Sequence, residues 1–239
     1  MKVENCWATP IGEDTIDMSL DMRAVLTRLL ELQDPCKTSD TYDGKNRDYK
    51  KFEEKVYNLF NYERYDKFDP FKIKAVSYLK KFEKAIAKII RSYIFQAWNL
   101  EDADIKVRAF GNASKTYSRR IPPHFHHGWD GVTVTYLSIG NEFKAMDETM
   151  QLTPKDTEHS GNLIMQDPRP AINFPFTDKA KTIKPLVGLT IIHPAYVWHE
   201  TEVHTRAGLR SCIVVDFKIL NRNCDYLPTP LVNEESMVV

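Results

Sequence analysis

The sequence predicts an α+β fold, with helices in the front half of the chain and an antiparallel β core behind them. Residues 71–97 keep their apolar side chains on one stripe at helical spacing. After Asn99 the pattern changes to short β-branched runs separated by Gly, Pro and Asn, which is typical of short strands. Helices followed by a run of strands favour α+β over an alternating βαβ fold. We expect the long helix to lie against the sheet.

The chain of 239 residues is interpreted as a single domain, residues 1–239. Within it we expect a mainly helical part over 1–100, a β core over 101–220 and an irregular tail over 221–239. Hydrophobic residues make up 42% of the chain and charged residues 28%, so the composition is that of an ordinary globular protein.

Net charge argues against large anionic partners. The 33 Lys and Arg residues balance the 33 Asp and Glu residues, so no global field attracts nucleic acid or an anionic membrane surface. The sequence contains neither a signal-peptide pattern nor an apolar run near the ~18 residues of a transmembrane helix. The cysteines are scattered without a C-x-x-C pair, which indicates a cytoplasmic protein with reduced thiols: Cys6, Cys36, Cys212 and Cys224.

Helices are expected over Asp21 to Pro35, 48–62 and 71–97. Asp21 is placed to cap the first helix, and Pro35 ends it. Asp69-Pro70 opens the third and strongest helix. Before them, Trp7–Ile11 could form an edge strand or a packed arm.

Strands are expected over Ile105–Phe110, Gly131–Ser138, Gly161–Met165, Leu186–Ile192 and Leu209–Ile219. Gly111-Asn112 is interpreted as the break after the first of these strands. The polar segment 141–160 is interpreted as an insertion or lid loop.

The segment Ile121–Asp130 holds three of the seven histidines. If it is extended, His124 and His126 point to the same face, because side chains alternate along a strand. In a helix the two rings would be about 200° apart and could not share a ligand. The double proline before them favours the extended conformation. Two imidazoles on one strand face are two ligands of a metal site that needs a third.

His199 is the candidate for the third ligand, and Arg210 follows it at the start of an apolar strand. A guanidinium does not lose its charge on burial, so a buried Arg210 needs an anionic partner. A carboxylate would fit it in a two-pronged pair.

These motifs resemble those of the iron(II)- and 2-oxoglutarate-dependent oxygenases. They are most similar to a branch of uncharacterised oxygenases with an H-x-H, distal His and Arg pattern. The resemblance spans most of residues 5–220. It is carried by Ala8-Thr-Pro-Ile11, Phe110-Gly-Asn112, His124-Phe-His126, Gly161-Asn-Leu-Ile-Met-Gln-Asp-Pro-Arg169, His199 and Arg210.

The resemblance implies a double-stranded β-helix core (jelly-roll, cupin-like) with the N-terminal helices packed against it. It implies that His124, His126 and His199 hold iron(II). Arg210 would bind the distal carboxylate of the co-substrate 2-oxoglutarate, and Tyr136 would add a hydroxyl contact. No catalytic residue beyond the metal site is implied. The implied reaction hydroxylates an unidentified substrate and releases succinate and CO2.

The chain departs from the common family pattern at two positions. Most members have H-x-D, so His126 stands where a carboxylate is usual. Asp130 is a possible alternative ligand, but along an extended strand it would lie about 13 Å from His126. Only a turn at Gly128 would bring it closer. Cys212 stands where many relatives have a serine that supports the co-substrate.

Two other functions fit the sequence. His124-x-His126-x-x-x-Asp130 with His199 imitates the ligand set of a cupin-type isomerase, dioxygenase or binding module, which would not use 2-oxoglutarate and would leave Arg210 unexplained. A structural zinc site or a non-catalytic binding protein is the third hypothesis, although three histidines without cysteine suit an open site better. We expect a small-molecule or peptide substrate, and a homodimer is among the oligomeric states that stay open.

Overall fold

The structure is a computed structural model and describes residues 9–33, 58–115, 120–140, 160–167 and 179–220. The helices are α1 (Leu20–Gln33), the short 3-10 helix η2 (Tyr62–Arg64) and α3 (Pro70–Trp98). The strands are β1 (Gly12–Thr15), β2 (Ile105–Ser114), β3 (Ile121–His124), β4 (Gly131–Ile139), β5 (Leu163–Gln166), β6 (Ala180–Ile183), β7 (Leu189–Pro194), β8 (His199–Thr201) and β9 (Arg210–Ile219).

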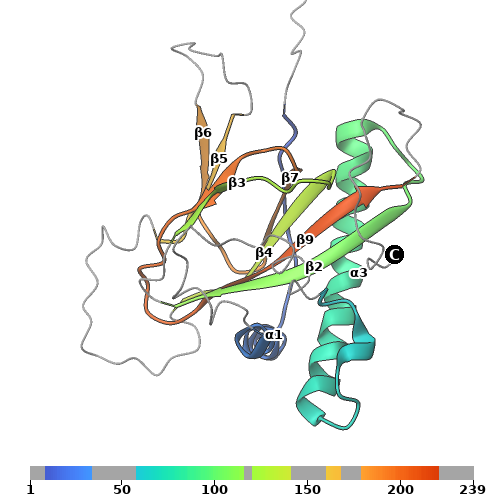
Figure 1. Cartoon of the computed structure of the whole chain (residues 1–239), viewed down its shortest axis with the longest axis vertical. Coiled ribbons are helices and arrows are strands. Elements are labelled where there is room, and N and C mark those ends of the chain that lie inside the picture. Colours follow the sequence, from blue (N-terminus) through green and yellow to red (C-terminus); the bar gives the residue numbers. More distant parts are fainter. Residues whose placement is uncertain (1–8, 34–57, 116–119, 141–159, 168–178, 221–239) are drawn as a thin grey trace, which may run out of the picture.

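The strands form two antiparallel sheets (Figure 1). The larger sheet has the order β1-β7-β4-β9-β2, and the smaller has the order β3-β8-β5-β6. Leu163 and Met165 of the smaller sheet pack with Ile191 of the larger one. The arrangement is therefore consistent with a β-sandwich core.

Strand β9 separates two packing layers, because its side chains alternate between the faces of the larger sheet. Val215 and Phe217 belong to the core that includes α1 and α3. Val214 belongs to the core on the opposite face, which we call the inner face. By the same alternation, Arg210 and Asp216 lie on the inner face with Val214. The inner face thus carries two buried charged groups on one strand.

Helix α3 confirms the helix predicted over 71–97. The Asp69 side chain accepts hydrogen bonds from the backbone N–H groups of Phe71 and Lys72, and Pro70 occupies the first turn. Asn99 ends the helix in the left-handed conformation, with φ 55°.

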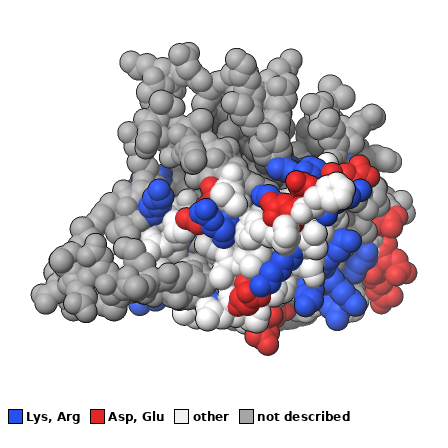
Figure 2. All heavy atoms as spheres, turned by 90° about the horizontal axis from the view of Figure 1, so that it is seen from below, with Lys and Arg blue, Asp and Glu red and all other residues white. Residues whose placement is uncertain are grey.

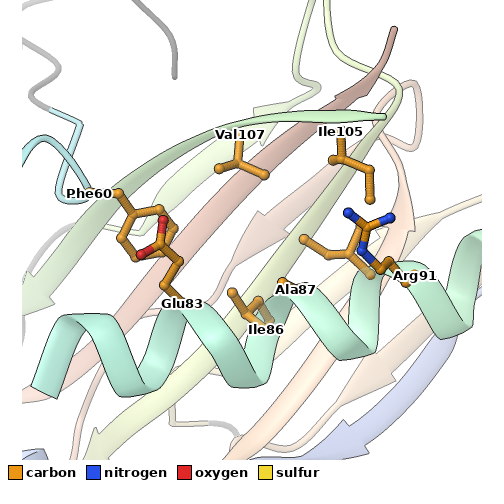
Figure 3. Close-up of a pocket in the computed structure, with 8 residues that line it drawn as sticks. Phe60, Glu83, Ile86, Ala87, Arg91, Ile105 and Val107 are labelled. Atoms are coloured by element: carbon orange, nitrogen blue, oxygen red, sulfur yellow. The ribbon is translucent and has the colours of Figure 1, made fainter. Parts of the chain in front are cut away.

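Helix α3 packs against β2, as Figure 3 shows. Ile86 and Ala87 of the helix face Ile105 and Val107 of the strand, with Phe60 beside them. The small gap that these residues line is a helix–sheet packing interface and does not include the histidines.

The predicted break at Gly111-Asn112 is wrong, because β2 continues through both residues to Ser114. A Cβ atom on Gly111 would lie 2.1 Å from Cδ2 of Leu30 in α1. Glycine is therefore needed here for the close approach of the helix rather than for a turn.

The start of α1 also differs from the prediction. The helix begins at Leu20, and Ser19 Oγ accepts the backbone N–H of Met22, so Ser19 rather than Asp21 caps it. The Asp21 carboxylate instead binds Lys74 and Tyr78 of α3. Because Asp21 is not the capping residue, its carboxylate can link α1 to α3.

The end of the helix predicted over 48–62 is wrong, because residues 58–61 form a turn and Tyr62 begins η2. The rest of the predicted helix lies outside the described residues. Segments 141–159, 168–178 and 221–239 also lie outside, and with them most of the expected lid loop, Arg169 and the tail.

Several strand boundaries differ from the prediction. Strands β5 and β7 begin two and three residues later than expected, after Gly161 and Gly188, whose φ angles are positive. Strand β6 (Ala180–Ile183) was not expected, because its side chains are mostly exposed. Trp7–Ile11 was expected to be an edge strand or a packed arm; its described residues 9–11 are not a strand, and residues 7–8 lie outside the described residues. The edge strand is β1, directly after them, and it pairs with β7.

Charged side chains of both signs are interspersed on the face drawn in Figure 2. This mixture agrees with the zero net charge of the chain. Among the described helices, none is both long and apolar enough to cross a membrane.

Candidate metal centre and anion site

The structure brings His124, His126 and His199 together. His124 ends β3 and pairs in register with His199, the first residue of β8. One ring nitrogen of each histidine lies within 4.8 Å of those of the other two. The three residues singled out as ligands from the sequence therefore form one cluster.

The backbone that places His126 in the cluster is not the extended strand that was predicted. Strand β3 stops at His124, so the two histidines do not lie on one strand. The backbone N–H of His126 instead donates to the carbonyl of Ala195, and Gly128 makes a turn with φ 84°. The bend places the His126 ring beside that of His124, with ring centres 5.4 Å apart.

Backbone carbonyls set the orientation of two of the rings. Nδ1 of His124 lies 2.8 Å from the Pro122 carbonyl, and Nδ1 of His199 lies 3.0 Å from the Val197 carbonyl. A carbonyl oxygen only accepts hydrogen bonds, so both Nδ1 atoms carry the proton. In the neutral form of each ring the Nε2 atom then keeps its lone pair, and this is the tautomer that binds a metal ion through Nε2.

The third ring is oriented by a carboxylate. Nδ1 of His126 lies 2.5 Å from Oδ1 of Asp216, and Nη2 and Nε of Arg108 lie 2.6 and 3.1 Å from Oδ2 of Asp216. Burial by itself raises the pKa of Asp216, but His126 and Arg108 outweigh it and hold the pKa below its usual value. The carboxylate is therefore ionised and accepts a hydrogen bond from Nδ1–H of His126, which leaves Nε2 as the nitrogen available to a metal ion.

A fourth histidine lies next to the cluster. The ring of His193 is fully buried, and its centre lies 4.9 Å from that of His199. Burial lowers the pKa of His193 to about 4, and burial with the neighbouring histidines lowers that of His199 to about 2. Both imidazoles are neutral near pH 7.

Three imidazole nitrogen donors in one cluster fit a divalent transition-metal ion with open coordination positions. His199 is buried, whereas His124 and His126 are partly exposed. Phe110 stacks on His126 with ring centres 6.1 Å apart and covers that side. The donor set thus suits an open site better than a closed structural one.

Asp130 is not part of this cluster. Its Oδ2 atom accepts the backbone N–H of Ile219 at 2.8 Å, and its own N–H donates to the Phe217 carbonyl. The turn at Gly128 bends His126 toward the cluster and leaves Asp130 against β9. The alternative ligand considered from the sequence is therefore engaged elsewhere.

Arg210 is a buried cation with one N–H group that lacks a hydrogen-bond partner among the described residues. The side chain is only 2% exposed, and its Nε donates to the Gly161 carbonyl at 3.0 Å. Among the described residues, Nη1 has no hydrogen-bond partner and no carboxylate forms an ion pair with Arg210. An unpaired buried charge costs several kcal/mol, on the order of 3–5, so the site favours an anion.

Tyr136 lies beside Arg210 on the inner face. The guanidinium carbon lies 5.1 Å from the centre of the tyrosine ring. The Tyr136 hydroxyl is buried and has no hydrogen-bond partner among the residues described. Burial raises the pKa of Tyr136 to about 12, with the positive charge of Arg210 opposing it, so the hydroxyl keeps its proton to donate.

The loop before Arg210 is held by two residues to which the sequence assigned no role. The Ser160 hydroxyl accepts the backbone N–H groups of Thr205 and Arg206. His204 is buried between Ser160 and the Gly208 carbonyl. Together they fix the segment that leads into β9.

Asp216 and Arg108 were missed by sequence reasoning. Asp216 interrupts an otherwise apolar run in β9, and an acidic residue inside a buried strand needs a partner. Arg108 pairs with it in register across β2 and β9. The acidic residue within this apolar run was the sequence feature from which a role for Asp216 could have been predicted.

No protein-family model matches the sequence, and no curated protein matches it. Among solved structures, AviO1 from Streptomyces viridochromogenes Tue57 is similar, with a TM-score of 0.51 and 12% identity over 93% of each chain. This chain shares the fold of AviO1.

Structures of the 2OG-Fe(II) oxygenase family are also among the similar ones. A Pseudomonas putida prolyl-4-hydroxylase matches with a TM-score of 0.43 and 13% identity over 89% of each chain. An oxidoreductase of that family from Burkholderia pseudomallei matches with a TM-score of 0.38 and 15% identity. That match covers 62% of this chain and 58% of the oxidoreductase. No conclusion about this chain is drawn from these two matches, and function has to follow from the site residues.

Proposed function

We propose that the chain is an iron(II)- and 2-oxoglutarate-dependent oxygenase with a double-stranded β-helix core. It would hydroxylate a small-molecule or peptide substrate. One observation carries the proposal, namely that an open cluster of three histidines coexists with a buried arginine that lacks a carboxylate partner among the described residues.

The histidines support the metal part of the proposal. His124, His126 and His199 would hold iron(II) through their Nε2 atoms, because each Nδ1 proton is engaged by an acceptor. When bound, the metal with dioxygen supplies the oxidising chemistry that converts 2-oxoglutarate to succinate and CO2 and transfers one oxygen atom to the substrate.

Arg210 and Tyr136 support the co-substrate part. A carboxylate placed against Nη1 of Arg210 would neutralise the buried charge and accept the Tyr136 hydroxyl proton in a hydrogen bond. Both residues lie on the inner face, and Gly161 and the Ser160–His204 contacts hold Arg210 in place. These residues would bind and orient the far end of a dicarboxylic acid. They would also exclude water from it.

The cupin-type alternative has weaker support. It needs Asp130 as a ligand, but that carboxylate accepts the Ile219 N–H. It also gives Arg210 no anion to bind. A metalloprotein that does not use 2-oxoglutarate would therefore leave a buried charge uncompensated.

The decisive experiment titrates the purified protein with iron(II) and 2-oxoglutarate under nitrogen. Co-substrate binding is followed by calorimetry and by the visible charge-transfer band, and succinate is measured after air is admitted. Arg210→Ala should raise the Kd for 2-oxoglutarate at least about 30-fold, equivalent to about 2 kcal/mol, while iron(II) binding persists. Arg91→Ala is the matched control, because Arg91 donates to the Ala103 carbonyl from α3.

The outcomes separate the hypotheses. The oxygenase hypothesis would be supported if the native protein and the Arg91 variant show the band and form succinate. The Arg210 variant should then show neither. Metal binding without band or succinate would favour the cupin-type alternative. Failure to bind any divalent metal would refute both.

A further inference from the structure

We propose that Asp216, held by Arg108, is a positioning residue that fixes the proton of His126 on Nδ1 and places a negative charge behind that ligand. The inference rests on the proposed metal site. It adds a carboxylate that acts on the metal through His126, at a site whose three ligands are all neutral.

The contacts assign each oxygen of Asp216 a separate role. Oδ1 accepts from Nδ1 of His126 at 2.5 Å, and Oδ2 accepts from Nη2 and Nε of Arg108. Asp216 is fully buried. A buried carboxylate with this geometry is therefore held by a cation on one side and an imidazole on the other.

Aromatic rings hold the arginine in turn. The Arg108 guanidinium carbon lies 5.0 Å from the centre of the Trp129 ring and 5.6 Å from that of Phe110. Phe110 also stacks on His126. The Asp216–Arg108 pair is thus part of a packed group that includes the ligand itself, and it has little freedom to rotate away.

The carboxylate compensates for the absence of an acidic ligand. A carboxylate hydrogen-bonded to a ligand histidine raises the basicity of the metal-binding nitrogen and fixes the ring orientation. Asp216 therefore supplies from behind His126 part of the negative charge that an aspartate in place of His126 would supply directly.

The donor-only character of Arg108 gives a sharp test. In Asp216→Asn the amide oxygen must face Arg108, because a guanidinium has no acceptor. The amide NH2 group then faces Nδ1 of His126 and forces the proton onto Nε2. The metal-binding lone pair is lost. In the double variant Arg108→Gln, Asp216→Asn, the glutamine can accept, so the amide can turn and restore the original tautomer.

The experiment measures the His126 tautomer by two-bond 15N–1H correlation in the metal-free protein, and Co(II) affinity by chelator competition. We expect Asp216→Asn to carry the proton on Nε2 and to bind Co(II) about 10- to 100-fold more weakly. The double variant should regain the Nδ1–H tautomer and much of the affinity. Asp130→Asn is the matched control, since it makes the same carboxylate-to-amide change outside the cluster, and it should bind Co(II) like the native protein.

An unchanged tautomer together with native Co(II) affinity in Asp216→Asn would overturn the positioning role and leave the proposed function intact. Failure of the native protein to bind Co(II) would overturn the proposed function instead. If Asp216→Asn does not fold, the positioning role is tested on the His126 proton of the native protein. An exchange-protected, far-downfield Nδ1 proton on His126 supports the role, and a proton on Nε2 overturns it.

Discussion

The guanidinium of Arg210 lies over the ring of Tyr136, and each residue keeps one buried polar group without a hydrogen-bond partner among the described residues: Nη1 of the arginine and the hydroxyl of the tyrosine. Two unsatisfied donors side by side define where an acceptor would bind. The pair therefore makes the anion site testable separately from the metal site.

Tyr136→Phe should weaken co-substrate binding and stabilise the co-substrate-free protein against unfolding. Loss of one hydrogen bond to a carboxylate, worth about 1.5–3 kcal/mol, should raise the Kd for 2-oxoglutarate roughly 10- to 100-fold in anaerobic calorimetry. The free protein should gain about 1 kcal/mol in unfolding free energy, because a buried hydroxyl without a partner is removed.

Tyr93→Phe is the matched control, since the Tyr93 hydroxyl donates to the Pro10 carbonyl. It should lose about 1 kcal/mol of unfolding free energy and leave the Kd unchanged. A native Kd in Tyr136→Phe would show that the hydroxyl does not contact the co-substrate.

Gly161→Ala should displace Arg210. A Cβ atom at Gly161 would lie 2.6 Å from Cδ and 2.8 Å from Nε of Arg210, at a φ of +67°. We expect a loss of about 1–2 kcal/mol in unfolding free energy from the left-handed backbone and a rise of about tenfold or more in the Kd for 2-oxoglutarate.

Gly188→Ala provides the comparison, because its φ is +80° and its added Cβ would meet the Ile16 carbonyl. It should be destabilised to a similar extent, with unchanged affinity for 2-oxoglutarate. Equal losses of affinity in both variants would mean that the effect is a general loss of folding.

How far the sequence predicted the site depended on the range of the interactions. His124 and His199 could be selected because residue type and strand pattern are local signals. The link between Asp216 and His126 could not be placed, because it depends on the turn at Gly128 and on the register of β9. Gly111 shows the same limit for the fold. The Gly111-Asn112 pair predicted a break in the strand, whereas the glycine is explained by the close packing of Leu30.

His124→Ala should abolish stabilisation by divalent metal. In the native protein, Co(II) at about 100 times its Kd should add about 2.7 kcal/mol to the free energy of unfolding, and a chelator should reverse the effect. The gain is followed by denaturant unfolding with and without metal. His127→Ala is the control, because the His127 ring lies beside Phe125 and outside the cluster, and it should respond like the native protein. A full response in His124→Ala would exclude that ring as a ligand.

Acid should destabilise the loop that precedes Arg210 through His204. Burial, with the charges of Arg210 and Arg206, lowers the pKa of His204 to about 4, although the Gly208 carbonyl opposes the shift. In the unfolded chain the pKa returns to about 6.5. The unfolded state therefore binds the proton more readily between these two values. The contribution of His204 is fully present above about pH 6.5 and is lost as the pH falls toward about 4.

His204→Asn should make the unfolding free energy of the metal-free protein depend less steeply on pH in that window. His193 and His199 are present in both proteins, so the difference between the two denaturation curves isolates His204. The difference should shrink as the pH falls, because only the chain that keeps His204 has an unfolded state stabilised by protonation of this ring. Parallel curves from about pH 4 to 6.5 would show that His204 takes up its proton equally in the folded and unfolded states.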